Sequence, residues 1–312
     1  MQRLKWLVSA IALLALACGE VSESSTPVIR EGEGLLELPL VSTSAGRSYK
    51  LVGATFAITG PQNATITDTS AESVSLALMA GDYSIQMTGE WHVERTDAPG
   101  VTVPVTLVSP NPLSFTLGEG ETRPVRFLFK VPGDATADVG ISVDSGGWIS
   151  GTFQFMSVPP DSSDVGIFRE LSGKTIPFVI SFETSTVTRS SDFGRREVII
   201  ETGPIAFQFG GSAKILVDRI APTFQGRSLM LRLSRQSFGS FFEGVWLEDV
   251  SSGLALTMEF YGYDTTGIDS DGYPIVRTLS YEAGFANLRQ GYGENSNGRI
   301  DAELGAGTIS PQ

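Results

Sequence analysis

The residues best suited to chemistry in this sequence are carboxylates and tyrosines, because histidine and cysteine are nearly absent. His92, in the stretch EWHVE, is the single histidine, and Cys18 is the single cysteine. One histidine and one cysteine are too few ligands for a conventional zinc site. A Ser-His-Asp triad would have to use His92, and the sequence has no G-x-S-x-G nucleophile elbow. The alternation around Trp91 and Val93 instead predicts that His92 is a solvent-facing strand residue.

Carboxylates are plentiful, with 35 Asp and Glu residues in a chain of 312. Two acids held several ångströms apart suffice for glycoside hydrolysis, so a hydrolase that uses paired carboxylates is an alternative hypothesis. With so many acids, close pairs arise by chance, and no spacing distinguishes one pair from the others. We therefore expect no catalytic residues.

Two acidic loops contain the oxygen ligands that calcium prefers. The first, YDTTGIDSDGYP, offers Asp264, Asp269 and Asp271. The second, GENSNGRIDAEL, matches the middle of an EF-hand loop through Asn295, Asn297 and Asp301. Its first ligand position is Gly293 and its twelfth is Leu304 instead of the bidentate Glu, so the ligand set is incomplete. Calcium is the one cofactor we consider, and the alternative interpretation of each loop is an acidic β-turn.

Tyrosines gather near the end of the chain. Of the 7 in the sequence, the last five are Tyr261, Tyr263, Tyr273, Tyr281 and Tyr292. Tyrosine combines an apolar ring with a polar tip, and exposed rings of this kind can stack on sugars. These residues are candidates for a carbohydrate-binding face, with ordinary strand and loop tyrosines as the alternative.

The elements that must position these residues are strands. The 35 Gly and 16 Pro favour turns, and no long segment repeats with the 3.6-residue period of a helix. From Leu36 the period is two, and roughly seven short strands are expected before residue 131, as in a β-sandwich. SVSLALMAGDYSIQM predicts a hairpin that turns at residues 80–82. Pro39 predicts that the first strand lies at a sheet edge.

Residues 35–131 also carry an order of motifs that resembles a known module. F-x-I-x-G-P at 56–61 is followed by L-x-x-G-D-Y-x-I at 78–85, N-P-x-x-F-x-L at 111–117 and V-x-F-x-F at 125–129. This order resembles a module of bacterial envelope lipoproteins. The second motif is also similar to carboxypeptidase-regulatory-like and transthyretin-like β-sandwiches. The resemblance implies a spacer or binding unit without catalytic residues.

The second part of the chain is also rich in strands. Apolar residues alternate at 176–182, 198–200, 205–209, 229–233 and 254–260, without a repeat of the first motif order. Small and acidic residues around 132–146 place a boundary near residue 144. We therefore expect an all-β protein, with a β-sandwich at 35–144 and a second sandwich or barrel-like domain at 145–312.

The N-terminus indicates the cellular location. Residues 1–17 combine Arg3 and Lys5 with an uncharged run, WLVSAIALLALA, which is too short to span a bilayer and is typical of a secretory signal peptide. The stretch ALAC resembles the lipobox of bacterial lipoproteins. This resemblance implies that Cys18 is lipidated, palmitate included, and becomes the first mature residue. The alternative is an ordinary signal peptide with an incidental Cys18.

Charge limits the partners of the mature chain. The formal net charge is −13, and loss of Arg3 and Lys5 with the signal peptide changes it to −15. Such a surface repels nucleic acid and anionic headgroups, so membrane contact is expected from the acyl anchor alone. Gly19, in place of an Asp after the cysteine, implies the outer membrane. The polar residues 18–34 are predicted to form a flexible tether.

The sequence thus predicts a non-catalytic, lipid-anchored protein of the cell envelope. Its expected role is binding or structural, with a polysaccharide or an envelope protein as ligand. The alternatives are the carboxylate hydrolase and a passive spacer or assembly component.

Overall fold

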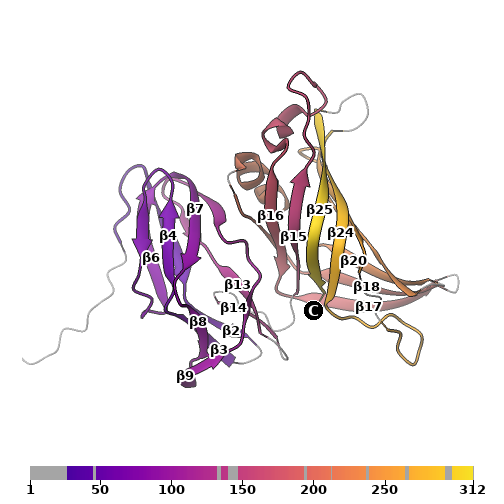
Figure 1. Ribbon diagram of the computed structural model, residues 1–312, viewed down its shortest axis with the longest axis horizontal. Coiled ribbons are helices and arrows are strands. Elements are labelled where there is room, and N and C mark those ends of the chain that lie inside the picture. The colour runs from indigo at the N-terminus through magenta and orange to yellow at the C-terminus, as the bar shows by residue number, and fades with distance from the viewer. Residues whose placement is uncertain are drawn as a thin grey trace, which may run out of the picture.

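The computed structural model describes residues 27–44, 47–131, 135–139, 147–192, 195–211, 213–236, 239–263, 267–291 and 297–311. Strand makes up 60% and helix 7%, which confirms the all-β prediction. Two halves lie side by side, each with its own hydrophobic core (Figure 1). Cys18 and the predicted boundary near residue 144 lie outside the described residues.

The first half is a sandwich of short strands. One sheet has the order β12-β1-β6, formed by β1 (Glu33–Pro39), β6 (Ser73–Met79) and β12 (Thr122–Pro124). The facing strands run β11-β7-β4-β5, formed by β4 (Thr55–Thr59), β5 (Ala64–Ile66), β7 (Gly81–Thr88) and β11 (Leu113–Leu117). Both contribute to one buried cluster, which includes Leu36, Phe56, Tyr83 and Phe115.

Two smaller sheets complete the first half. One has the order β2-β3-β8-β9, formed by β2 (Val41–Ser44), β3 (Arg47–Val52), β8 (His92–Arg95) and β9 (Ala98–Val103). The other has the order β10-β13-β14, formed by β10 (Thr106–Leu107), β13 (Phe127–Val131) and β14 (Ala135–Val139). On β8, Val93 is buried, whereas His92 and Glu94 on the opposite face are hydrogen-bonded at 2.7 Å. The alternation of EWHVE predicts this arrangement.

The hairpin predicted at residues 73–87 is wrong, although both of its strands exist. β6 pairs with β1, whereas β7 pairs with β4 and β11, so the two strands belong to different sheets. The chain changes sheet at Gly81, whose φ of 148° favours glycine. Leu78 and Tyr83 both point into the shared core. Two facing strands and a hairpin give the same alternation, so the sequence pattern could not separate them.

Pro39 does not mark an edge strand. β1 is the central strand of its sheet, antiparallel to β6 and parallel to β12. The pairing with β12 covers only residues 35–37, so it ends before Pro39. The missing amide hydrogen of proline therefore costs no ladder bond on that side of the strand.

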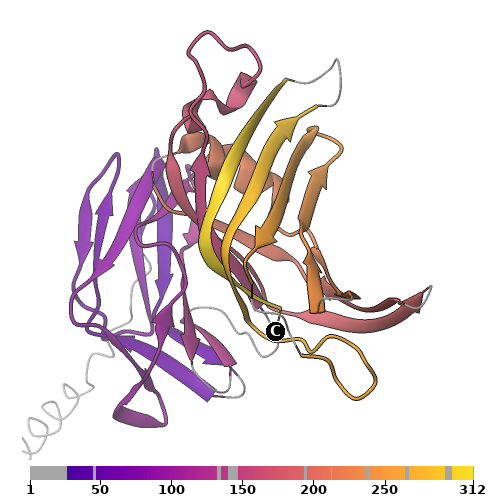
Figure 2. The same ribbon diagram turned by 45° about the vertical axis from the view of Figure 1, so that its right-hand side comes forward.

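The second half is built on a strongly curved sheet (Figure 2). Its strands run β22-β23-β24-β25-β15-β16-β19 and continue into β11 of the first half, giving 11 strands in all. They are β15 (Gly147–Phe155), β16 (Thr175–Phe182), β19 (Ile205–Phe209), β22 (Val245–Asp249), β23 (Leu254–Tyr261), β24 (Leu279–Gln290) and β25 (Gly298–Ser310). A second sheet, β17-β18-β20-β21, comprises β17 (Ser185–Asp192), β18 (Arg195–Thr202), β20 (Met230–Gln236) and β21 (Gly239–Glu243). Among the strands described, neither sheet closes into a barrel.

Alternation predicts the inner face of these strands correctly. The apolar residues of TIPFVISF that alternate from Ile176 to Phe182 are all buried. On β23, Leu256 and Met258 are buried, and Tyr261 shares the outer face with Glu259, to which its hydroxyl donates at 2.7 Å. A 3₁₀ turn, η1 (Gly166–Leu171), adds buried side chains to the same core.

A short helical segment is the element that the sequence analysis missed. It consists of η2 (Leu216–Ile220) and α1 (Ala221–Phe224), and it lies on the side of the second half that faces the first half (Figure 1). Leu216, Ile220 and Phe224 are fully buried, with the spacing of one helix face. The segment is shorter than the windows in which this period becomes visible. No helix within the described ranges is long and apolar enough to cross a membrane.

The packing of this segment predicts the effect of truncating Ile220. Ile220→Ala should lower the free energy of unfolding by about 2–5 kcal/mol, because it removes a side chain from a closed core. The neighbouring exposed Arg219→Ala is the matched control and should change that free energy by less than about 0.5 kcal/mol. Chemical denaturation of both variants measures the difference. Equal values for the two would contradict the packing described here.

Candidate functional site

The two halves are joined by a backbone pairing between β11 and β19. Ser114 opposes Phe209 in the register of these strands, and the Ser114 hydroxyl donates to the carbonyl of Gly211. Beside this pairing lies a small buried cluster that is separate from both main cores, formed by Leu128, Trp148 and Val179. One continuous sheet therefore passes from one half into the other.

Gln208 reinforces the junction with partly buried hydrogen bonds. Its Nε2 donates to the carbonyl of Arg126 at 3.0 Å, and its Oε1 accepts from the hydroxyl of Ser109 at 2.8 Å. The Ser109 hydroxyl oxygen also accepts from the amide of Leu128 at 2.7 Å. These bonds hold the backbone at Arg126 against β19.

A charged bridge joins the helical segment to the first half. The Thr116 hydroxyl donates to Asp218 at 2.6 Å, and the ammonium of Lys214 contacts both Asp218 and Asp82. The hydrogen bonds to Asp218 and Asp82 raise the pKa of Lys214 above its usual range. This bridge places one ammonium between two carboxylates, so the charge of Lys214 is fully compensated.

Two cavities flank the junction, and Ser114 and Phe115 line both of them. The first has a volume of about 460 Å³ and includes the bridge residues Asp82 and Lys214. The second has a volume of about 490 Å³ and lies between residues 121–126 of the first half and the end of the helical segment. We call the second one the arginine cavity. Its polar lining includes Glu121, Arg123, Arg126, Gln208 and Gln225, and its apolar lining includes Phe115, Val125, Ala206, Phe207, Ala221 and Pro222.

Arg126 brings a charge to this cavity that the described residues do not neutralise. Its Nε is buried without a hydrogen-bond partner, and no ion pair of the described chain includes its guanidinium. The nearby carboxylate of Glu121 is already engaged. Its Oε1 lies 3.3 Å from Arg123, and its Oε2 accepts from the amide of Gly118 at 2.7 Å. A buried donor without a partner costs about 1–3 kcal/mol, so it needs an explanation beyond stability.

The arginine cavity is suited to binding an anion. Its volume falls in the range of about 300–1,000 Å³ that small-molecule sites occupy. Arg123 and Arg126 outweigh Glu121, which leaves a positive charge inside a chain whose net charge is −13. No histidine or cysteine is among the described residues that line the cavity.

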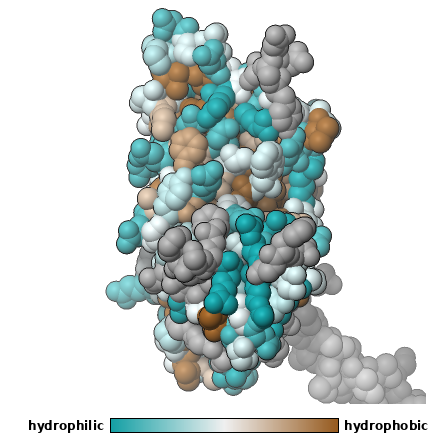
Figure 3. Space-filling model, turned by 90° about the vertical axis from the view of Figure 1, so that its right-hand side faces the viewer, coloured by the Kyte–Doolittle hydropathy of each residue, from teal (hydrophilic) through white to brown (hydrophobic). Residues whose placement is uncertain are grey.

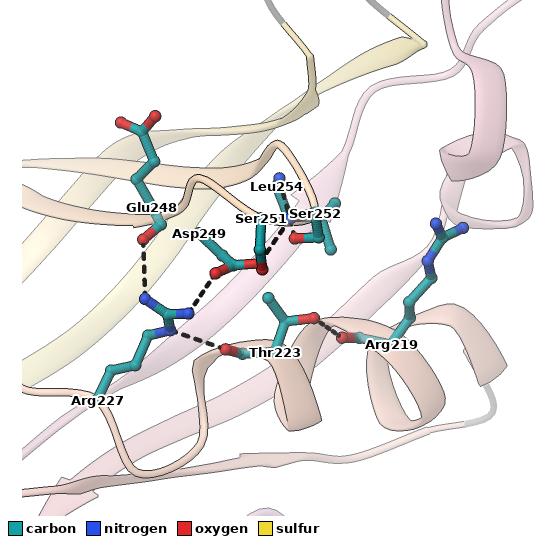
Figure 4. Close-up of polar contacts among 8 residues, drawn as sticks. All are labelled: Arg219, Thr223, Arg227, Glu248, Asp249, Ser251, Ser252 and Leu254. Carbon is teal, nitrogen blue, oxygen red and sulfur yellow. Dashed lines mark hydrogen bonds and ion pairs between the residues drawn. The ribbon is translucent and has the colours of Figure 1, made fainter.

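A second charged cluster lies where α1 meets the turn between β22 and β23 (Figure 4). Arg227 donates to the carboxylate of Asp249 and to the carbonyls of Thr223, at 3.0 Å, and Glu248, at 3.3 Å. Asp249 Oδ2 accepts from the hydroxyl of Ser251 at 2.6 Å and from the backbone amide of Ser252 at 2.8 Å. The guanidinium of Arg227 and the carboxylate of Asp249 are thus both occupied by groups of the chain itself. We interpret this cluster as a structural clasp.

The tyrosines proposed for sugar stacking do not share one exposed face. Tyr281 is only 2% exposed, and its hydroxyl donates to the carbonyl of Ser150 at 2.9 Å, so the expectation that it is exposed is wrong. The alternation of β24 places it on the inner face, where its ring contacts Phe260. Tyr263 packs against the same core, and its hydroxyl oxygen accepts from the amide of Phe242 at 3.0 Å.

The remaining tyrosines lie apart from one another. Tyr261 is half exposed on β23, whereas the ring of Tyr273 lies against Arg189 and Arg196 at 5.1 Å and 5.4 Å. Tyr292 lies outside the described residues. The visible face of this half is mainly hydrophilic with isolated apolar side chains (Figure 3).

The first acidic loop is organised by its own turn and by an arginine. Asp269 Oδ1 accepts from the amides of Tyr273, at 2.9 Å, and Asp271, at 3.0 Å, and its Oδ2 accepts from Arg189 at 2.7 Å. The amide of Tyr273, then Arg189, lower the pKa of Asp269. Asp271 also faces Arg189, at 3.6 Å. Calcium would have to displace this arginine, and Asp264 lies outside the described residues.

The second loop is divided between a sheet and residues that the structure does not describe. Asp301 lies on β25, where it accepts from Asn287 at 2.6 Å and from Arg299 at 3.0 Å. Asn297 precedes the strand and donates its amide to the carbonyl of Gln290 at 2.7 Å, and Asn295 is undescribed. Within the described ranges, no group of three His, Cys, Asp or Glu side chains could hold a metal ion. The calcium sites stay a prediction.

Sequence reasoning did not identify the arginine cavity. Arg123 and Arg126 stand three apart in ETRPVRF, so a regular strand would place them on opposite faces. β12 ends at Pro124 and β13 begins at Phe127, and this interruption allows both arginines to line one cavity. The other wall comes from residues about eighty positions later. The only signal was a basic pair in an acidic chain.

No protein-family model, curated protein sequence or solved structure matches this chain.

The clasp predicts a pH-dependent contribution to stability. Hydrogen bonds from Ser251 and Ser252, and then the charge of Arg227, lower the pKa of Asp249 in the folded state. The ionised carboxylate of Asp249 therefore contributes its full stabilisation above the unfolded-state pKa of about 3.9. This stabilisation is lost as the pH falls through the lower pKa of the folded state. Asp249→Asn should lower the Tm at pH 7, and the deficit should shrink below about pH 4.

Thermal unfolding of the wild type and Asp249→Asn across this pH range measures the effect. Asp161→Asn, at an exposed position, is the control and should leave the Tm nearly unchanged. A deficit that stays constant down to acidic pH would show that the carboxylate charge is not its source.

Proposed function

We propose that this protein is a non-catalytic, lipid-anchored protein of the cell envelope that binds a ligand in the arginine cavity. The observation that carries the binding role is Arg126, whose buried Nε has no partner among the described residues. A bound anion would neutralise the charge of this guanidinium, which lines the cavity and belongs to no ion pair among the described residues. A polysaccharide and an envelope protein are the ligand sources that we consider.

The anchor rests on the N-terminal sequence. ALAC resembles a lipobox, and it follows a positively charged start and a short apolar run. The acidic chain disfavours direct contact with anionic headgroups, so an acyl anchor is the simplest attachment. Gly19 favours the outer membrane as its location.

Carboxyl chemistry in the described chain gives the hydrolase alternative little support. A glycosidase needs a general acid with a raised pKa. The carboxyl groups whose pKa is clearly shifted are all shifted downward: Asp68, Glu94, Asp97, Glu170, Asp218, Asp249 and Asp269. These acids are adapted to remain ionised in salt bridges, turns and clasps.

Lipidation predicts that Cys18→Ala releases the protein from the membrane. Without the thiol no acyl chain can be attached, and the folded part has no apolar helix in the described residues to replace it. Fractionation of the host envelope should move the variant to the soluble fraction or leave it as an uncleaved precursor. Full retention as a processed, membrane-bound chain would contradict the anchor.

Ligand binding is tested by blocking the cavity. Ala206 lies on β19 with its side chain lining the arginine cavity, and Ala206→Trp should fill part of that space. The mature chain is immobilised through its N-terminus, and detergent-solubilised host envelope is passed over it. A glycan or protein retained by the wild type should be reduced at least about tenfold by Ala206→Trp.

Ala283→Trp on the exposed face of β24 is the matched control and should retain the ligand. Both variants are checked for an unchanged Tm. A ligand that both variants retain equally would place binding elsewhere. An empty eluate from the wild type would favour the passive spacer instead.

A further inference from the structure

We propose that the arginine cavity recognises a carboxylate, held by the guanidinium of Arg126, on a compact ligand with a partly apolar body. This inference rests on the proposed binding function and names the class of ligand. Three properties of the cavity support it: an unused donor group, a small net positive charge and a lining that is partly apolar and partly polar.

The unused donors of Arg126 have the right shape for a carboxylate. A guanidinium presents its N–H groups as a planar fork that matches two carboxylate oxygens. Neither Glu121 nor another described carboxylate occupies that fork. The carbonyl of Arg126 is fixed by Gln208, so the backbone that carries the fork is held in place before a ligand arrives.

The charge of the cavity favours a monoanion. Arg123 remains paired with Glu121 at 3.3 Å, which leaves about one uncompensated positive charge, that of Arg126. A carboxylate neutralises one charge, whereas a phosphate monoester brings up to two. The acidic remainder of the chain adds repulsion against the second charge.

The other lining residues indicate which kind of ligand body the cavity would accept. Phe207, Pro222 and Val125 present apolar surface, and Gln225 is the polar side chain on the opposite wall. The Oε1 of Gln225 accepts from the amide of Phe207 at 3.3 Å, which leaves its amide nitrogen as the group that could donate to a ligand. A ring with one carboxylate and few further charges fits this lining. An acidic sugar unit and an aromatic acid are the two sources of this chemistry.

Two matched pairs of probes separate these sources. Glucuronate is compared with glucose, and benzoate with benzamide, each by titration calorimetry against the mature chain produced without its acyl groups. The carboxylate of at least one pair should bind more than about tenfold more tightly than its neutral partner. Preference within the sugar pair identifies an acidic glycan, and preference within the benzoate pair identifies an aromatic acid.

Variants of the arginine complete the test. Arg126→Gln should weaken binding of the preferred carboxylate at least about tenfold, and Arg126→Lys, which keeps the charge but loses the fork, should give an intermediate loss. Arg219→Gln removes the same charge from the exposed side of the helical segment and should leave binding unchanged. Tm values confirm that each variant is folded.

Three results would overturn the inference: neutral probes that bind as tightly as their acids, no binding of either acid, or an Arg126→Gln variant that binds normally. These results differ from a failure of the proposed function. If envelope capture is lost in Ala206→Trp but unchanged in Arg126→Gln, the cavity binds a ligand and the carboxylate is wrong. If capture is unaffected by both, the cavity is not the binding site.

Discussion

The pairing of β11 with β19 is the constraint on which the rest of this structure depends. Each half has its own core, and the pairing at Ser114 and Phe209 makes one sheet of the two. Gln208 and the Lys214 bridge then fix the distance between the halves on either side of that strand pair. The facing surfaces of the two halves do not pack tightly everywhere, and the two cavities are the space left between them.

The two cavities differ in how their charges are treated. The ammonium of Lys214 is paired with both Asp82 and Asp218, so the first cavity has no uncompensated positive charge from this lysine. In the arginine cavity, Glu121 is shared between Arg123 and a backbone amide, and Arg126 is left over. Proteins usually satisfy buried donors, and exceptions concentrate at functional sites. Among the described residues, the unpaired guanidinium of Arg126 therefore supports the proposal that this cavity binds an anion.

Much of the fold could be predicted from the sequence, because a period of two reports directly which residues face a core. This pattern correctly placed Ile180 and Met258 in the interior. It could not tell a hairpin from two facing strands at Gly81, nor recognise a helical segment nine residues long. The candidate site was beyond prediction for a related reason. Its walls come from residues 121–126 and 206–225, which only the junction brings together.

A crystal structure of the mature chain with the preferred carboxylate probe tests the central claim most directly. The account predicts that the two halves are joined through β11 and β19 as described, with the carboxylate in the cavity between them. Its oxygens should lie within hydrogen-bond distance of the Arg126 guanidinium, at about 2.7–2.9 Å. A guanidinium paired with Glu121 beside an empty cavity, or a probe bound at a distant surface, would contradict it.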